Sequence, residues 1–213
     1  MKNSKKNFNN NSNNLSKFCL DANIFIDSYK RYYPFDLFPT FWELLEKLAN
    51  KNIVISTISI YNEIAKNEDK LADWCKKNKK MFKDIRNEDN PDSQKYFGCI
   101  IEIIRFIKEK YTSKKAEEFL GTLGESENNA DIEVIAYSKV YGYIVVTFEG
   151  SAGNIESTVV RKGPEIGKYN CNVKIPDICN FFNVECINLF EMLKIIKEEY
   201  KLDNICEIEN LLI

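Results

Sequence analysis

Four acidic side chains in this 213-residue sequence follow, or lie close to, short apolar segments that are typical of β-strands. They are Asp21, Glu63, Asp131 and Glu149. Asp21 ends the first such segment, and Glu149 lies two residues past the end of the third. Glu63 lies in the predicted helix after the second segment, and Asp131 lies near the start of the predicted helix before the third. In a parallel sheet these positions meet at one edge, where four negative charges repel each other unless a cation lies between them.

The sequence contains no histidine, which restricts the chemistry available to these acids. Serine–histidine and cysteine–histidine catalysis and histidine-bound zinc are therefore excluded. A site of carboxylate oxygens favours Mg²⁺ or Mn²⁺. Such a site suits phosphodiester hydrolysis, because the cation binds phosphate oxygens and lowers the pKa of an attacking water. Simpler explanations stay open: Glu63 and Asp131 could be surface residues of helices, and Glu149 could belong to a turn.

The order of the predicted elements indicates an α/β fold with a mostly parallel sheet, because strands and helices alternate along the chain. We expect strands at 18–21, 53–56, 143–147 and 186–188. We expect helices at 23–30, 36–50, 57–66, 126–140, 175–183 and 189–200, and a helical region over 67–121. The Gly-rich connection from 149 to 174 is expected to contain a strand segment at 158–160.

The composition, 44% hydrophobic, is sufficient for one core, and no linker suggests a second domain. Residues 1–16 are rich in Asn, Lys and Ser and should be disordered, which leaves 17–213 as a single domain. No apolar run approaches the roughly 18 residues of a membrane span, and the N-terminus does not resemble a signal peptide, so we expect a cytoplasmic protein. The seven cysteines include no CxxC pair and are expected to be reduced thiols.

The net charge of −2 neither indicates nor excludes a nucleic-acid-binding protein, because basic side chains can cluster locally. One cluster, 76–86, carries six basic residues and one acid, and it is either the solvated face of a helix or a surface that attracts a polyanion. The candidate phosphate-binding residues are Lys30, Arg31, Lys76, Lys77, Lys80, Arg161 and Lys162.

The acidic residues also occur within sequence motifs that resemble a known family. The motifs are LDAN at 20–23, IYNEI at 60–64, ADIEVIAYS at 130–138 and VVTFE at 145–149, in this order. Together they resemble a PIN domain, most closely a prokaryotic PIN-like subfamily of toxins from type II toxin–antitoxin pairs. Three further stretches share this resemblance: RYYPFD at 31–36, KIPD at 174–177 and CINLFEML at 186–193. The resemblance covers roughly residues 18 to 195.

The resemblance implies a Rossmann-like α/β/α sandwich, bound Mg²⁺ or Mn²⁺, and hydrolysis of single-stranded RNA. It places Asp21, Glu63, Asp131 and Glu149 at the four catalytic acidic positions. By the same resemblance, Asp21, Asp131 and Glu149 would bind the metal, and Glu63 would share it. Many PIN domains have Asp where this chain has Glu149.

The resemblance also suggests supporting residues and partners. Asn23 and Thr147 would orient carboxylates or water, and Asp177 is a candidate additional acid. The expected partners are an RNA substrate and a cognate antitoxin, and a homodimer stays open. Two alternatives also stay open: a PIN-like module that binds nucleic acid or protein without cleavage, and a structure-specific DNA nuclease.

Overall fold

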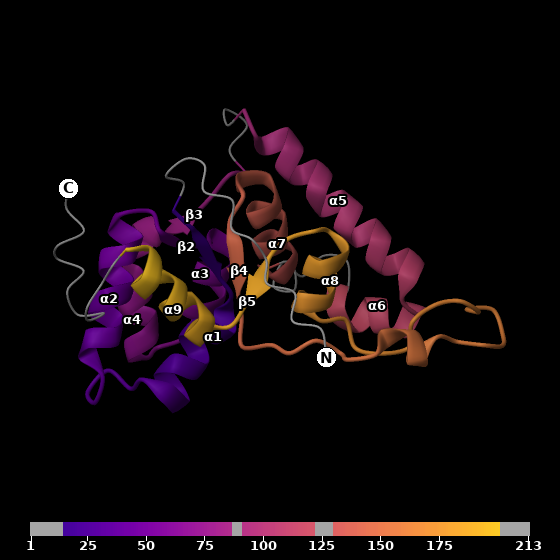
Figure 1. Ribbon diagram of the computed structural model, residues 1–213, viewed down its shortest axis with the longest axis horizontal. Helices are drawn as coiled ribbons and strands as arrows, with labels where there is room; N and C mark the ends of the chain where they lie inside the picture. The colour runs from indigo at the N-terminus through magenta and orange to yellow at the C-terminus, as the bar shows by residue number, and fades with distance from the viewer. Residues whose placement is uncertain (1–14, 87–90, 122–129, 201–213) are drawn as a thin grey trace.

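A computed structural model describes residues 15–86, 91–121 and 130–200 (Figure 1). The first half of the described chain contains β1 (Phe18–Leu20), α1 (Ala22–Asp27), the π-helix η1 (Ser28–Tyr32), α2 (Pro39–Asn50), β2 (Val54–Thr57), α3 (Ile58–Ala65), α4 (Lys70–Lys77), the 3₁₀ helix η2 (Lys79–Met81) and β3 (Phe82–Lys83). The second half contains α5 (Ser93–Lys110), α6 (Ser113–Leu120), α7 (Ala130–Tyr141), β4 (Ile144–Val146), the 3₁₀ helix η4 (Ile155–Thr158), α8 (Ile175–Phe181), β5 (Cys186–Ile187) and α9 (Leu189–Glu199).

These strands form one five-stranded, all-parallel sheet in the order β3-β2-β1-β4-β5. β1 lies at the centre, where Phe18 is in register with Val54 of β2 and Ile144 of β4. Helices cover both faces: in Figure 1, α2, α4 and α9 lie to the left of the sheet, and α5, α7 and α8 lie to its right. The fold is therefore α/β, as predicted, with a sheet between two helical layers that is consistent with a Rossmann-like sandwich.

The central strands form because their side chains are mostly apolar and are covered by helices on both faces; the buried Ser56 hydroxyl of β2 donates to the Leu20 carbonyl of β1. Every residue of β1 and β2 is buried, which is typical of parallel strands covered on both faces. Pro39 lies in the first turn of α2, where its fixed φ favours a helix start. Gly142 follows α7 with a φ of 70°, which allows the chain to turn directly into β4.

Two predictions of secondary structure were wrong. The predicted helical region over 67–121 is interrupted after α4, which ends at Lys77, because β3 then pairs with β2 through Phe82 and Ser56. Met81, Phe82 and Ile85 are buried, so the basic run is interrupted by a short edge strand rather than forming one helix face. In place of the predicted strand at 158–160, Thr158 ends η4 and Val159 makes only an isolated antiparallel bridge to Tyr169.

The first and last parts of the described chain are in contact. The backbone N–H and hydroxyl of Ser16, at the end of the predicted tail, donate to the Glu199 carboxylate over 2.8 and 2.7 Å. Residues 1–14 and 126–129, for which a tail and a helix start were predicted, lie outside the described residues. The six cysteines among the described residues are free of disulfide bonds. Within the described segments, no helix combines the length and apolarity needed to cross a membrane.

Candidate acidic site at the carboxyl edge of the sheet

Asp21 lies at the point where β1 ends and α1 begins. It is the N-cap residue of α1, and its Oδ1 accepts a hydrogen bond of 2.6 Å from the backbone N–H of Ala22. Only 3% of the residue is exposed. A carboxylate is favoured at a helix N-terminus, which compensates in part for the loss of hydration. The sequence therefore places a buried acid at the centre of the sheet edge.

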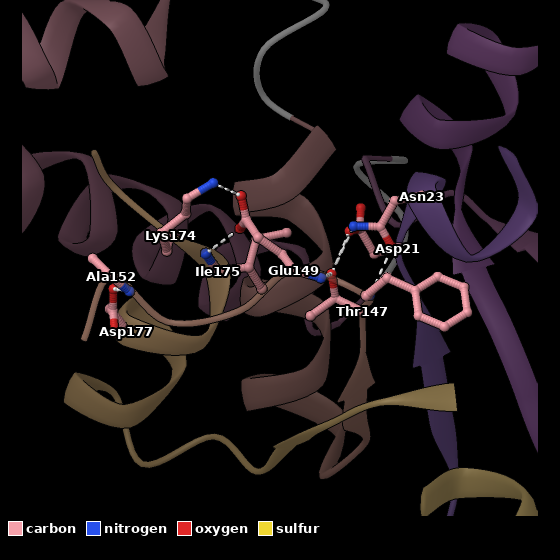
Figure 2. A network of polar contacts seen from close by, with 9 residues as sticks. Asp21, Asn23, Thr147, Glu149, Ala152, Lys174, Ile175 and Asp177 are labelled. Carbon is pink, nitrogen blue, oxygen red and sulfur yellow. Dashed lines mark hydrogen bonds and ion pairs between the residues drawn. The ribbon is translucent and has the colours of Figure 1, made fainter. Parts of the chain in front are cut away.

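Thr147 and Asn23 fix the position of this acid (Figure 2). The Thr147 hydroxyl, which follows β4, donates to Asp21 Oδ2 over 2.8 Å. The Thr147 hydroxyl oxygen also accepts hydrogen bonds from Asn23 Nδ2 (2.8 Å) and from the Glu149 backbone N–H (3.0 Å), so the one donor and two lone pairs of this hydroxyl are all used. Asn23 Oδ1 accepts from the Phe148 backbone N–H over 2.9 Å. The end of β4 is thus bound to the start of α1 through two polar side chains.

Glu149 is held by the segment that leads into α8. Its Oε1 accepts a charge-assisted hydrogen bond of 2.6 Å from Lys174 Nζ, and its Oε2 accepts from the Ile175 backbone N–H over 2.7 Å (Figure 2). Asp177, in the first turn of α8, accepts from the Ala152 backbone N–H over 2.8 Å. Both acids therefore fasten the connection after β4 to α8.

The four predicted acids interact electrostatically. Burial raises the pKa of Asp21 to about 6, and the charges of Glu149 and Glu63 contribute to the increase. Burial also raises the pKa of Asp131 to about 7, and the charges of Asp21, Glu149 and Glu63 raise it further. Burial raises the pKa of Glu63 as well. The ammonium of Lys174 opposes the increase at Asp131, so this lysine contributes positive charge to the acidic site.

The donor atoms and the negative charge of the site both suit a hard divalent cation. Its carboxylates offer oxygen alone, and their mutual repulsion would be relieved by a cation. The present side-chain arrangement does not enclose one: among the described residues, no group of three or more Cys, Asp and Glu side chains is arranged to hold a metal ion. Glu149 in particular is bonded to Lys174 and to the start of α8, and it would have to leave these partners to bind a cation.

The candidate phosphate-binding residues do not gather on one surface. Lys30 and Arg31 lie in η1, where Lys30 lines an open cavity of about 580 Å³ and Arg31 pairs with Asp27 at 3.4 Å. Lys76 and Lys77 end α4, and Lys80 lies in η2. The loop that holds Arg161 and Lys162 extends to the far right in Figure 1, whereas α4 lies at the left. The groups around 76–80 and 161–162 are therefore on opposite sides of the molecule.

The sequence did not single out two charged residues that the structure places in or near this region. Glu133 is buried, accepts a 2.6 Å hydrogen bond from the Ser59 hydroxyl and interacts with the Arg86 guanidinium, so it joins α7 to α3 and to the segment after β3. Lys174 entered the sequence analysis only as the first residue of the KIPD stretch and was not a candidate site residue. Its pairing with Glu149 spans 25 positions in sequence, and no local pattern marks such a contact.

Comparisons with known proteins give a family and no further relative. Residues 18–200 match the family model described as Domain of unknown function (DUF4411). No curated protein and no solved structure matches the chain. The match includes the whole acidic site and every described helix and strand.

Proposed function

Because the chain belongs to the DUF4411 family, whose description states no function, we propose from its acidic site that it is a metal-dependent endoribonuclease. It would hydrolyse single-stranded RNA with Mg²⁺ or Mn²⁺. The observation that carries the proposal is Asp21, a 3% exposed carboxylate at the centre of the sheet edge, which lies within the electrostatic influence of two other acids. A buried like-charge cluster destabilises a fold and is typical of functional sites.

We propose the roles of the acids from the sequence resemblance, and the electrostatic interactions among the acids support this choice. Asp21, Asp131 and Glu149 would hold the cation, and Glu63 would share it. When bound, the cation supplies positive charge for the phosphate oxygens and lowers the pKa of an attacking water. The sequence resemblance to PIN domains supports the same four residues.

The neighbouring polar residues keep the site in place. Thr147 and Asn23 orient Asp21 and connect it to the backbone on both sides of Phe148. Lys174 neutralises Glu149 in the arrangement described above. Loss of this ion pair would free one more carboxylate for the cation, so Lys174 and the cation compete for the same oxygen atoms.

The biological role rests on the sequence resemblance alone. We propose a cytoplasmic toxin of a type II pair, with an RNA substrate and an antitoxin that holds the enzyme inactive; a homodimer is compatible with this role. A small neighbouring gene that encodes a DNA-binding protein would support the role. The main alternative is a module that binds nucleic acid or protein without cleavage. It is favoured by the hydrogen bonds from Lys174 and the Ile175 backbone N–H, because they engage both oxygens of the Glu149 carboxylate.

A cleavage assay with the full chain tests the proposal. End-labelled single-stranded RNA and a branched DNA are incubated with wild-type protein in Mg²⁺ or Mn²⁺, and EDTA is the negative control. Asp21→Asn should abolish RNA cleavage and keep the wild-type circular dichroism spectrum. Asp73→Asn is the matched control, because the Asp73 side chain is 70% exposed on α4 and pairs only at the surface with Lys76. Full cleavage by Asp21→Asn would refute the assignment of Asp21 to the site. Cleavage of the branched DNA but not of the RNA would show that DNA is the substrate.

A further inference from the structure

Three aromatic rings from distant parts of the chain make successive contacts beside the acidic site. Tyr32 ends η1, Phe148 follows β4, and Phe190 lies in the first turn of α9. The ring centroids of Tyr32 and Phe148 are 5.1 Å apart, and those of Phe148 and Phe190 are 6.2 Å apart. Tyr32 is 45% exposed and Phe190 is 48% exposed, so the two outer rings of this aromatic strip face solvent.

The aromatic strip is attached to the acidic site through its middle ring. Phe148 lies between Thr147 and Glu149 in sequence, and its backbone N–H donates to Asn23 Oδ1 over 2.9 Å. The Asn23 side chain in turn donates to Thr147, which bonds to Asp21. The network that positions the buried acid therefore also positions the strip.

The outer rings are held by secondary structure. Phe190 follows Asn188, which forms a capping box with Glu191 at the start of α9. Such a box fixes the first turn of a helix. Tyr32 is preceded by Lys30 and Arg31, which are exposed basic residues of the same π-helix. Two exposed basic residues therefore precede one exposed ring of the strip in sequence, and Arg31 of these also pairs with Asp27 at 3.4 Å.

We propose that Tyr32, Phe148 and Phe190 form a platform on which unpaired bases of a single-stranded RNA stack beside the acidic site. Aromatic rings bind any base through its π-face, whereas the bases of a duplex are already stacked and paired. The basic residues of η1 would contact the phosphate backbone that accompanies the stacked bases. This inference deepens the proposed function and rests on it, because the RNA would be the substrate of the same site.

Binding without catalysis tests the platform. Fluorescence anisotropy in EDTA measures the affinity of the full chain for a labelled oligouridine and for an abasic oligoribonucleotide of equal length and charge. Tyr32→Ala and Phe190→Ala should each weaken oligouridine binding by roughly fivefold to 150-fold, the range that corresponds to the loss of one base–aromatic stack. Tyr32→Phe should retain the affinity, because the ring remains.

The controls separate stacking from charge and from cleavage. Phe97→Ala removes an aromatic ring that is 42% exposed on α5, and it should leave binding unchanged. The abasic oligonucleotide should bind wild type more weakly than oligouridine and should be insensitive to Tyr32→Ala. Equal binding of the two oligonucleotides, or wild-type affinity of both alanine variants, would overturn the platform and leave the strip as a contact for a protein. Because no metal is present, failure of cleavage does not affect this result.

Discussion

Neutralising Asp131 should stabilise the metal-free protein, and the effect should depend on pH. In the folded chain, burial and the charges of Asp21, Glu149 and Glu63 raise the pKa of Asp131 from 3.8 to about 7. The folded state therefore keeps the Asp131 proton to higher pH than the unfolded state does. Between about pH 4 and pH 7 the folded state binds more protons, so its stability falls as the pH rises through this window.

The size of the effect follows from the pKa. A change of one pKa unit corresponds to about 1.4 kcal/mol, so ionisation of Asp131 destabilises the fold by at most about 4 kcal/mol at pH 8. Asp21 and Asp131 share the repulsion, and removal of one charge also relieves the other. At pH 8 we expect Asp131→Asn to raise the free energy of unfolding by about 2–4 kcal/mol, which corresponds to roughly 5–15 °C in Tm for a protein of this size. At pH 4 the variant and the wild type should be equally stable.

Thermal unfolding in EDTA between pH 4 and pH 8 measures this gain, with Asp73→Asn as the exposed control, which should follow wild type at every pH. In Mn²⁺ the wild type should recover part of the difference, because a ligand that binds only the folded state stabilises it. If Asp131→Asn has the same Tm as wild type at pH 8, or a lower one, the acids do not repel each other as described, and the reasoning fails.

Two further substitutions test the polar residues around the acids. Lys174→Met should lower the metal-free stability by only about 1 kcal/mol, because the ion pair with Glu149 is partly exposed, and it should tighten Mn²⁺ binding in calorimetry; unchanged Mn²⁺ affinity would contradict the competition between Lys174 and the cation. Thr147→Val should destabilise the protein by about 1–3 kcal/mol in urea unfolding, because it removes the hydroxyl that donates to the buried Asp21, whereas Thr147→Ser should be nearly neutral. It should also raise the pKa of Asp21 further, since this hydrogen bond lowers it, and nuclear magnetic resonance titration can measure that change.

The sheet centre and its acid could be predicted from the sequence because the signal there is local. β1, β2 and β4 are short apolar runs, and Asp21 interrupts the first of them where the buried strand ends. Once the sheet is taken as parallel, the common edge follows from topology. These features need no information about distant contacts.

The rest depends on contacts that local patterns do not encode. β3 has two residues and lies within a basic run, so only the burial of Met81, Phe82 and Ile85 distinguishes it from an exposed helix. The bond between Lys174 and Glu149 joins a loop to a strand end. The aromatic strip joins η1, the segment after β4 and α9, and each ring viewed alone is an ordinary apolar residue of its element.

The central claim is that the acids around Asp21 bind a divalent cation, and isothermal titration calorimetry with Mn²⁺ tests it most directly. Wild type and Asp73→Asn should bind Mn²⁺ with the same affinity at up to millimolar concentration, and Asp21→Asn should lose this binding while it remains folded. No binding heat from wild type at millimolar Mn²⁺ and Mg²⁺, or equal binding by Asp21→Asn, would contradict the claim.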